Sequence, residues 1–511
     1  MSLRFKSGKK NGSSNEEESL LALEVPAAPE DAPPRAPGDA TPPRALTLRR
    51  LVLVLMAPTL MIIMTGAMFA VAVPTIRVEY GLSADVTSWL LVAYTLPFML
   101  FMPLYGRLGD GIGKRRLLLA GIVLFLSGTV MLTFIRSLPM ILLARALQGV
   151  GSAGVNPLAM AMIIQFAPPE QQGKALGTWN SIGPVAGMVG PFLAGAMIDS
   201  LGWRSILAPA IVLGVVTVIF TAALLPRSTR RPSVRAVMKS FDWTGVLLFN
   251  GAVALLVFFT SSRPITGVDP LRDFRLLGLG LLFLVGFVVW VRRRENPFVD
   301  LRIFRNRNFS LASICVSIRM MLMGGASFAV PLYVTDLYGF PAAVTGTLLM
   351  LHSGALLVTM WLGGILIDRW RSRMQIVLGL SVESLAMLGF VLLPAGAPVG
   401  LVFLLLATHG LGAGLCLAAL HLYALGGVPR SRSATAAGLY SMVRFGGSML
   451  GAAIGGVVLE SGLATHGITT VGYRSTFLFY LVVSVAGSAA ALGLTRRMPR
   501  PVDESQEPSA A

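Results

Sequence analysis

The stretch Gly106-Arg-Leu-Gly-Asp110-Gly-Ile-Gly113-Lys-Arg-Arg116 lies between two apolar runs, at 85–105 and 117–136. Each run has about the ~20 residues that a helix needs to cross ~30 Å of hydrocarbon. Gly106 and Gly113 permit a tight turn and a close approach of helices. Asp110 among four cations can make and break ion pairs at a membrane surface as helices shift. Taken alone, the stretch also fits an ordinary solvated turn.

Apolar runs of similar length continue along the chain, and the sequence predicts fourteen transmembrane helices in all. Composition agrees, because apolar residues make up 54% of the chain and charged residues only 13%. That charged share is about half of what soluble domains carry. We therefore expect an all-α integral membrane protein with spans near 51–74, 85–105, 117–136, 138–166, 172–200, 205–225, 242–262, 274–291, 309–335, 341–367, 374–395, 400–425, 434–459 and 475–495.

The net charge of +18 does not indicate a nucleic-acid partner, because the basic residues sit in short clusters between the apolar runs. Cytoplasmic loops of membrane proteins are enriched in lysine and arginine. With the N-terminus inside, 32 of the 42 basic residues fall on the cytoplasmic side, against 7 outside and 3 within helices. The sequence thus predicts cytoplasmic N- and C-termini. Cys315 and Cys416 lie in apolar runs, and we read both as core residues.

A degenerate second copy of the opening stretch reads Gly364-Ile-Leu-Ile-Asp368-Arg-Trp-Arg-Ser-Arg373. Two copies at corresponding places indicate two related halves, as in transporters built from repeats. The predicted organisation is a disordered cytoplasmic tail, a six-helix bundle, two inserted helices with flanking loops, a second six-helix bundle and a short tail, at 1–47, 48–228, 229–308, 309–496 and 497–511.

The opening stretch is similar to the signature loop of the major facilitator superfamily, and further segments resemble the fourteen-helix drug:proton antiporters of that family. These segments are Leu143 to Gly151, the Gly190-Pro191 pair, Phe241 to Gly245, Pro297 to Phe309, and a late helix with Gly438 and Arg444. The resemblance implies that one set of residues switches the conformation: Gly106, Asp110, Gly113, Lys114, Arg115, Asp368, Gly190, Pro191 and Arg444.

Arg145, Gln148, Ser152 and Asn156 fall on one face of the fourth span at 3.6 residues per turn. Polar side chains are costly in lipid, and we expect this face to line a substrate cavity. The alternative is a structural hydrogen-bond network. Arg319 lies near the midplane of the ninth span and also fits a cavity. Its alternative role is a salt bridge with Glu383 on the eleventh span.

Candidates for a coupling proton are Glu383, His352 and His409, the last also a cavity candidate. Histidine titrates near neutral pH, although a buried histidine is often simply hydrogen-bonded. The antiporter subfamily usually has an aspartate in the first span, where this chain has Thr65, and an asparagine where it has Ala70. Coupling has then moved elsewhere, or the substrate is neutral, anionic or lipid-like. We add Thr65 to the cavity candidates.

The sequence favours a secondary transporter that exports hydrophobic drugs or metabolites by alternating access in exchange for protons. A gradient-independent facilitator or flippase is the alternative, and a transporter-like receptor ranks below both. No enzymatic constellation, metal site or ATP-binding loop is found, and we expect no cofactor besides a proton gradient. We expect a monomer in the bacterial inner (plasma) membrane, with the lipid bilayer and a small hydrophobic substrate as partners, and an optional periplasmic adaptor.

Overall fold

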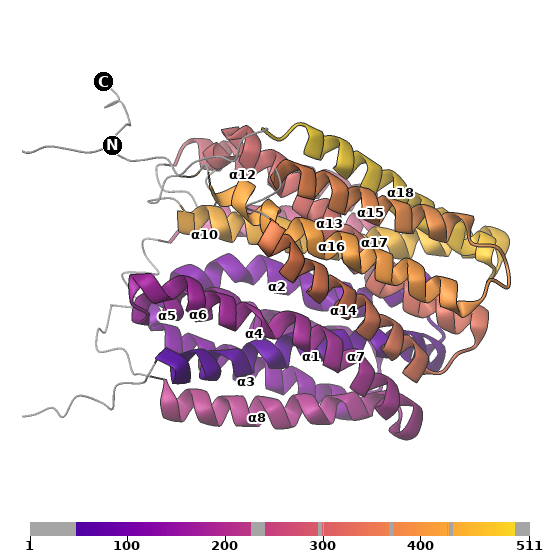
Figure 1. Ribbon diagram of the computed structural model, residues 1–511, viewed down its shortest axis with the longest axis horizontal. Helices are drawn as coiled ribbons and strands as arrows, with labels where there is room; N and C mark the ends of the chain where they lie inside the picture. Colours follow the sequence, from indigo (N-terminus) through magenta and orange to yellow (C-terminus); the bar gives the residue numbers. More distant parts are fainter. Residues whose placement is uncertain are drawn as a thin grey trace, which may run out of the picture. The chain divides into compact units, whose positions relative to one another are not determined.

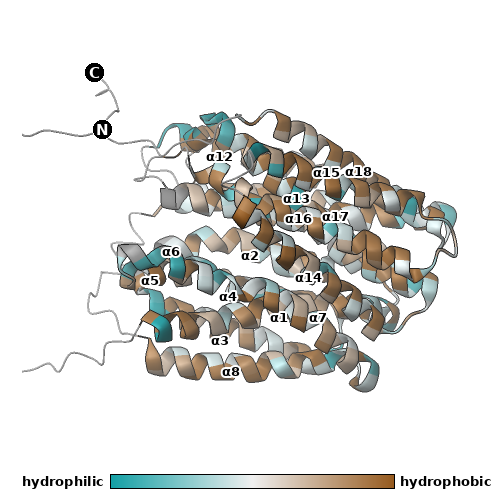
Figure 2. Ribbon diagram, viewed as in Figure 1, coloured by the Kyte–Doolittle hydropathy of each residue, from teal (hydrophilic) through white to brown (hydrophobic). Residues whose placement is uncertain are grey.

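The computed structural model describes residues 48–225, 241–294, 299, 301–366, 372–426, 428 and 433–495. These residues form helices, and fourteen of the helical stretches are long and apolar enough to cross a membrane. The fourteen predicted spans are thereby confirmed. The helices run side by side along one direction (Figure 1), with apolar residues along their lengths and polar ones gathered near their ends (Figure 2).

The first six spans are built from eight α-helices and one short 3₁₀ helix, and we call them the N-terminal set. They are α1 (Leu48–Tyr80), α2 (Ala84–Ile112), α3 (Lys114–Phe134), α4 (Leu138–Ser152), α5 (Val155–Phe166), α6 (Pro169–Asn180), α7 (Ile182–Leu201), η1 (Trp203–Ile206) and α8 (Leu207–Leu224). The fourth span is divided between α4 and α5, and the fifth between α6 and α7.

An inserted pair of spans, α10 (Trp243–Thr260) and α12 (Phe274–Arg292), is joined through the short α11 (Arg263–Thr266). Asp242 ties the pair together, because its carboxylate accepts from the amide of Gly245 at 3.0 Å and from the Trp290 indole at 2.8 Å. A short 3₁₀ helix, η2 (Leu301–Arg305), precedes the next span.

The last six spans form the C-terminal set. They are α13 (Arg307–Tyr338), α14 (Ala342–Leu366), α15 (Ser372–Leu392), α16 (Val399–Leu425), α17 (Ser433–His466) and α18 (Thr470–Leu492). Helix α7 packs against α14 and α2 against α17, and these two pairs make most of the contact between the two sets; α1 adds smaller contacts with α13 and α14.

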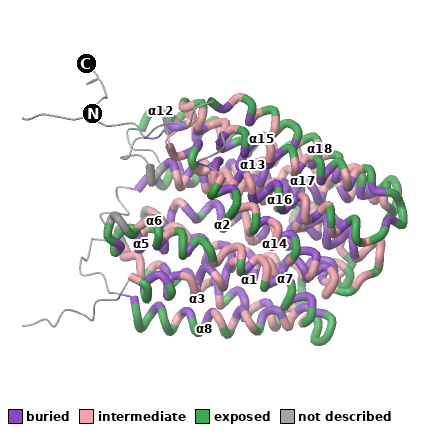
Figure 3. Tube along the Cα trace, in the orientation of Figure 1, coloured by how far each residue is buried: buried purple, intermediate pink, exposed green. Residues whose placement is uncertain are grey.

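The helical array has two ends, which we call the basic end and the far end. The basic end carries Lys114 to Arg116, Arg292 to Arg294 and Arg305 to Arg307; the far end carries the turns after α1, α13 and α15. Residues facing the neighbouring helices are buried, whereas α8, α15 and α18 expose apolar side chains on their outer faces (Figure 3). Such exposed apolar faces fit a lipid environment, in which the driving force for packing is close contact rather than apolar burial.

Candidate transport path and buried polar clusters

Arg145 of α4 is the centre of a buried polar cluster in the N-terminal set. Its side chain is 1% exposed, its Nε donates to the carbonyl of Leu90 at 3.0 Å, and its Nη1 donates to Oε1 of Gln148 at 2.8 Å. Nε2 of Gln148 in turn donates to Oγ1 of Thr129 on α3 at 2.9 Å. The cluster therefore joins α2, α3 and α4 through side chains that sequence spacing alone would not pair.

Aromatic rings cover the Arg145 guanidinium on the side of α1 and α2. Its Cζ lies 3.9 Å from the centre of the Phe69 ring and 4.7 Å from that of Tyr94. Such cation–π contacts are stronger when water is excluded. Arg145 and Gln148 thus form a hydrogen-bond network that is packed among four helices.

The fourth span is divided between α4 and α5 at Ala153 and Gly154, which keep right-handed helical backbone angles; the polar face that the sequence places along this span stays a prediction. Gly154 lies at the break, where a Cβ would meet the Tyr105 ring at 2.1 Å. Ser152 donates to the carbonyl of Gly149 within its own helix at 3.0 Å, and Asn156 lies beyond the break, half-buried on α5. On α1, Thr65 is buried and donates to the carbonyl of Met61 at 2.7 Å.

A second buried cluster lies in the C-terminal set and centres on α16. Arg319 of α13 is 2% exposed, and its Nε donates to the carbonyl of Ala413 at 2.6 Å. Glu383 of α15 is fully buried and packs against Gly412, the residue before Ala413 on α16. A Cβ at Gly412 would lie 3.0 Å from Cγ of Glu383. Both carboxylate oxygens of Glu383 lack a hydrogen bond within the described chain. The salt bridge with Arg319 considered from the sequence is therefore not formed.

His352 of α14 pairs with His409 of α16, which lies about one helical turn before Ala413. Nε2 of His352 lies 2.9 Å from Nδ1 of His409, and both rings are buried. At that distance one nitrogen donates and the other accepts. The second nitrogen of His409, Nε2, makes no hydrogen bond to a described residue. We call Arg319, His352, Glu383 and His409 the α16 cluster.

The loop between α2 and α3 fixes the basic end of the N-terminal set. Gly113 takes φ 99°, a conformation that favours glycine, and so permits the turn as expected. Nζ of Lys114 donates to Gln165 of α5 at 2.8 Å, and Arg115 donates to the carbonyls of Thr221 and Ala222 at the end of α8. These bonds hold α5 and α8 against the loop.

The close helix approach expected at Gly106 occurs instead at Gly109. A Cβ at Gly106 would meet nothing within 4 Å, whereas one at Gly109 would lie 2.5 Å from the Leu158 side chain of α5. The side chain of Asp110 and the whole of Asp368 lie outside the described residues.

Helix α7 approaches both α1 and α14 at the Gly190-Pro191 pair. A Cβ at Gly190 would lie 3.0 Å from the Met64 carbonyl of α1. On α14, a Cβ at Gly346 would lie 2.2 Å from the Pro191 carbonyl. Small residues therefore allow the backbones of the two sets to touch.

Arg444 lies where α17 meets α2. Its Cζ is 4.5 Å from the centre of the Phe445 ring, and Phe445 packs edge-on against Phe98 of α2 with ring centres 4.8 Å apart. The Nε of Arg444 has no hydrogen bond within the described chain. Phe445, the residue after Arg444, thus lies at a contact between the two sets, and the switch role of Arg444 stays a prediction.

Acidic side chains join the two sets at the far end, and sequence reasoning did not find these contacts. Asp336 of α13 pairs with Arg77 of α1 at 2.6 Å and also accepts from the Tyr473 hydroxyl of α18 at 2.6 Å. Glu460 of α17 accepts from the amide of Ala84 at 2.7 Å. We call these contacts, with the one described next, the far-end latch.

The remaining contact of the latch caps α14 from the N-terminal set. The two oxygens of Asp199 on α7 accept from the amides of Ala342 and Ala343 at 2.9 and 2.8 Å. Both Asp199 and Glu460 meet the unpaired amides and partial positive charge of a helix N-terminus. The sequence shows that Asp199 and Glu460 lie near far-end helix termini, which is typical of capping residues. It does not show that each acid caps a helix of the other set.

Comparison with known proteins agrees with this arrangement. The family model described as Major Facilitator Superfamily matches residues 55–452. The multidrug resistance protein Stp of Mycobacterium tuberculosis is 29% identical over 79% of this chain and 74% of its own. The tetracenomycin C resistance and export protein of Streptomyces glaucescens is 25% identical over 79% of this chain and 76% of its own.

Solved structures resemble the fold at low sequence identity. The crystal structure of a D-xylose-proton symporter matches with a TM-score of 0.65 at 13% identity, covering 89% of this chain and all of its own (100%). A peptide transporter structure, POT in complex with sulfate, matches with a TM-score of 0.66 at 16% identity, covering 88% and 96%. At these identities the likeness concerns the fold alone. The chain belongs to the Major Facilitator Superfamily and is a multi-pass secondary transporter, not an enzyme.

Proposed function

We propose that this transporter exports a hydrophobic compound from the cytoplasm across a bacterial plasma membrane in exchange for protons. Two relatives are named for multidrug resistance and for tetracenomycin C resistance and export. The enrichment of lysine and arginine assigns the basic end to the cytoplasm. The far-end latch would then hold the outer side closed in the described conformation.

Glu383 is the proton carrier in this proposal, and the state of its carboxyl group is the single observation that carries it. The side chain is fully buried halfway along α15, and neither oxygen is hydrogen-bonded within the described chain. An ionised carboxylate without partners is costly inside a lipid-embedded bundle. A carboxyl group that holds a proton avoids this cost, and we assign the protonated form to this conformation.

Arg319 provides the counter-charge for the deprotonated form. Arg319 donates to the carbonyl of Ala413 on α16, and Glu383 contacts Gly412, the residue before it. A small shift between α13 and α15 would bring the guanidinium and the carboxylate together. Protonation and deprotonation would then select between two packings of the C-terminal set, which is what coupling to a gradient requires.

The test uses purified protein in proteoliposomes with an imposed pH gradient. A panel of hydrophobic compounds that includes tetracenomycin C is first screened by thermal stabilisation to find a transported probe. We expect the gradient to drive accumulation of the probe, and Glu383→Gln to retain probe binding while losing the gradient response. Asp269→Asn, at an ion pair with Arg272 on the surface, is the matched control and should behave as wild type.

A gradient-independent facilitator or flippase is the second candidate. Thr65 occupies the position of α1 at which the drug:proton antiporters usually have an aspartate. The described hydrogen bonds of Arg145 go to the Leu90 carbonyl and to Gln148, and none goes to a carboxylate. Equal transport by wild type with and without the gradient would favour this candidate and contradict proton exchange. Movement of a fluorescent phospholipid between leaflets would identify a flippase.

The charges of the clusters favour a neutral or anionic hydrophobic substrate over an organic cation. Arg145, Arg319 and Arg444 lie within spans, against one central carboxyl group, Glu383. A permanent cation would be repelled by this balance in a medium of low dielectric constant.

We propose a monomer as the working unit, with an adaptor beyond the far end only where a second membrane must be crossed.

A further inference from the structure

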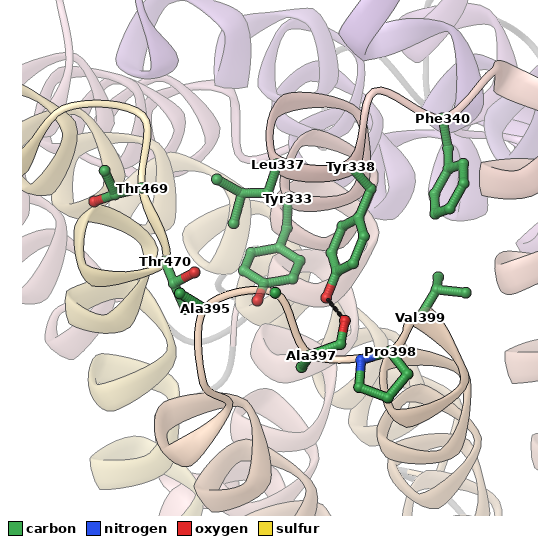
Figure 4. A pocket seen from close by; sticks show the side chains of 11 residues that line it. Tyr333, Leu337, Tyr338, Phe340, Ala395, Ala397, Pro398, Val399, Thr469 and Thr470 are labelled. Carbon is green, nitrogen blue, oxygen red and sulfur yellow. Dashed lines mark hydrogen bonds between the residues drawn. The ribbon is translucent and has the colours of Figure 1, made fainter.

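A cavity of about 510 Å³ opens at the far end, within the C-terminal set. Its walls come from the end of α13, the turn after it, the turn between α15 and α16, and the start of α18. Figure 4 shows Tyr333 and Tyr338 projecting side by side from α13 toward the α15–α16 turn, with Phe340 beyond Tyr338. The volume is within the range of small-molecule sites.

Aromatic rings make the cavity suited to a flat, apolar molecule. The rings of Tyr338 and Phe340 are stacked with centres 5.6 Å apart and an interplanar angle of 7°. Tyr333 is held rigidly behind them, because its ring packs edge-on against Tyr473 and Phe477 at 5.2 and 5.6 Å. Aromatic surfaces of this kind bind planar rings by stacking and edge contacts.

The polar groups of the cavity are hydrogen-bond donors. Tyr338 uses its hydroxyl to donate to the Ala397 carbonyl at 2.9 Å; the buried hydroxyl of Tyr333 lies next to Tyr338 and Thr470 without a well-formed hydrogen bond to either. Buried hydroxyl groups normally have a partner. The unpaired hydroxyl of Tyr333 therefore points to a ligand atom that accepts a hydrogen bond.

Two helix N-termini also face the cavity, because α16 begins at Val399 and α18 at Thr470. The first amides of a helix have no partner within it and favour a nearby anion. The described residues that line the cavity include no acid. Asp336, which is nearby on α13, is already occupied by Arg77 and Tyr473.

We propose that this cavity binds an aromatic acid: the planar ring lies against Tyr338 and Phe340, and the acid group accepts from Tyr333 and from the helix N-termini. All of the walls belong to the C-terminal set. The site borders the far-end latch, because Tyr333 packs against Tyr473 and Leu337 follows Asp336, but no residue of the N-terminal set is among those that line it.

The experiment measures binding of 2-naphthoate to the full-length protein in lipid nanodiscs by saturation-transfer NMR and titration. Cyclohexanecarboxylate tests the need for the aromatic ring, and 2-naphthamide tests the need for charge. Ala395→Trp fills the cavity from an exposed turn, and Ser137→Trp adds the same bulk at an exposed far-end turn of the N-terminal set. Tyr333→Phe removes the unpaired hydroxyl and keeps the ring.

We expect saturable naphthoate binding in wild type and in Ser137→Trp, loss of binding in Ala395→Trp, and roughly tenfold weaker binding in Tyr333→Phe. The two comparison ligands should bind more weakly than naphthoate. Absence of saturable binding in wild type would overturn the proposal, as would unchanged binding in Ala395→Trp. If Ala395→Trp does not fold, equal affinity of wild type and Tyr333→Phe overturns it instead.

Discussion

Arg77 and Asp336 are 259 residues apart in the sequence, yet Nη1 of the arginine lies 2.6 Å from Oδ2 of the aspartate. The pair joins α1 to α13 at the far end, and Tyr473 of α18 donates to the same carboxylate oxygen. One acid thereby links the first span to two spans of the C-terminal set. Outward opening must separate this pair, because its two partners belong to different sets.

Asp336→Asn is expected to open the far end more often. The side chains of the pair are 13% and 11% exposed, between a surface pair and a fully buried one. We therefore expect a weakening of about 1.4 kcal/mol, or a tenfold shift toward the open form. Ser88→Cys reports opening, because Ser88 is buried on α2 against Gly456 of α17. A membrane-impermeant maleimide should label it about tenfold faster.

Labelling of this reporter is specific, since Cys315 and Cys416 are both buried. Asp269→Asn, which breaks exposed ion pairs with Arg272 and Arg263 and no contact between the two sets, is the control and should leave the labelling rate unchanged. An unchanged rate in Asp336→Asn as well would show that the ion pair does not hold the far end closed.

Gly346→Ala is expected to disturb the contact between α7 and α14. The new Cβ would lie 2.2 Å from the Pro191 carbonyl, and backbone cannot yield as a flexible side chain does. Overpacking of this kind costs about 1–3 kcal/mol. Gly364→Ala on the same helix is the matched control, because a Cβ there meets nothing within 4 Å. Thermal unfolding in detergent should separate the two variants, with only Gly346→Ala destabilised; equal midpoints would refute the close approach.

Gln148→Leu is expected to lower the stability of the N-terminal set. The substitution leaves Nη1 of Arg145 without its amide acceptor at a site from which water is excluded. Loss of a buried hydrogen-bond partner costs about 1–3 kcal/mol, more for a charged group. Ser152→Ala, which removes a bond within α4 and a hydroxyl contact with Tyr94 but leaves no charged group without an acceptor, should cost less. A stable Gln148→Leu protein with weakened substrate binding would instead assign this face to the substrate cavity.

His409→Asn is expected to retain the response to a pH gradient if Glu383 carries the proton. The asparagine amide can keep the contact that Nδ1 of His409 makes with Nε2 of His352 at 2.9 Å. His466→Asn, at an exposed position near the far end, is the control for a neutral imidazole replacement. Proteoliposome transport with and without the gradient checks this, and a selective loss in His409→Asn would move the coupling site to the histidine pair.

The transmembrane spans could be predicted from the sequence because crossing a bilayer depends on a local property, the length and apolarity of a segment. Gly113 illustrates the same point, since its turn follows from its own backbone freedom. The role of the face through Arg145 and Asn156 stays a prediction. The Tyr105 ring of another helix packs closely against Gly154, between α4 and α5, and no local pattern reveals this contact.

The sequence by itself determined the number of spans, the clustering of basic residues at one end and the family. Only the tertiary structure decided which polar residues meet across helices: Gln148 with Thr129, His352 with His409, Arg77 with Asp336, and Glu383 with no described hydrogen-bond partner. The physical reason is that apolar length is read along one helix, whereas a buried polar group is stabilised by whichever neighbouring helix brings it a partner.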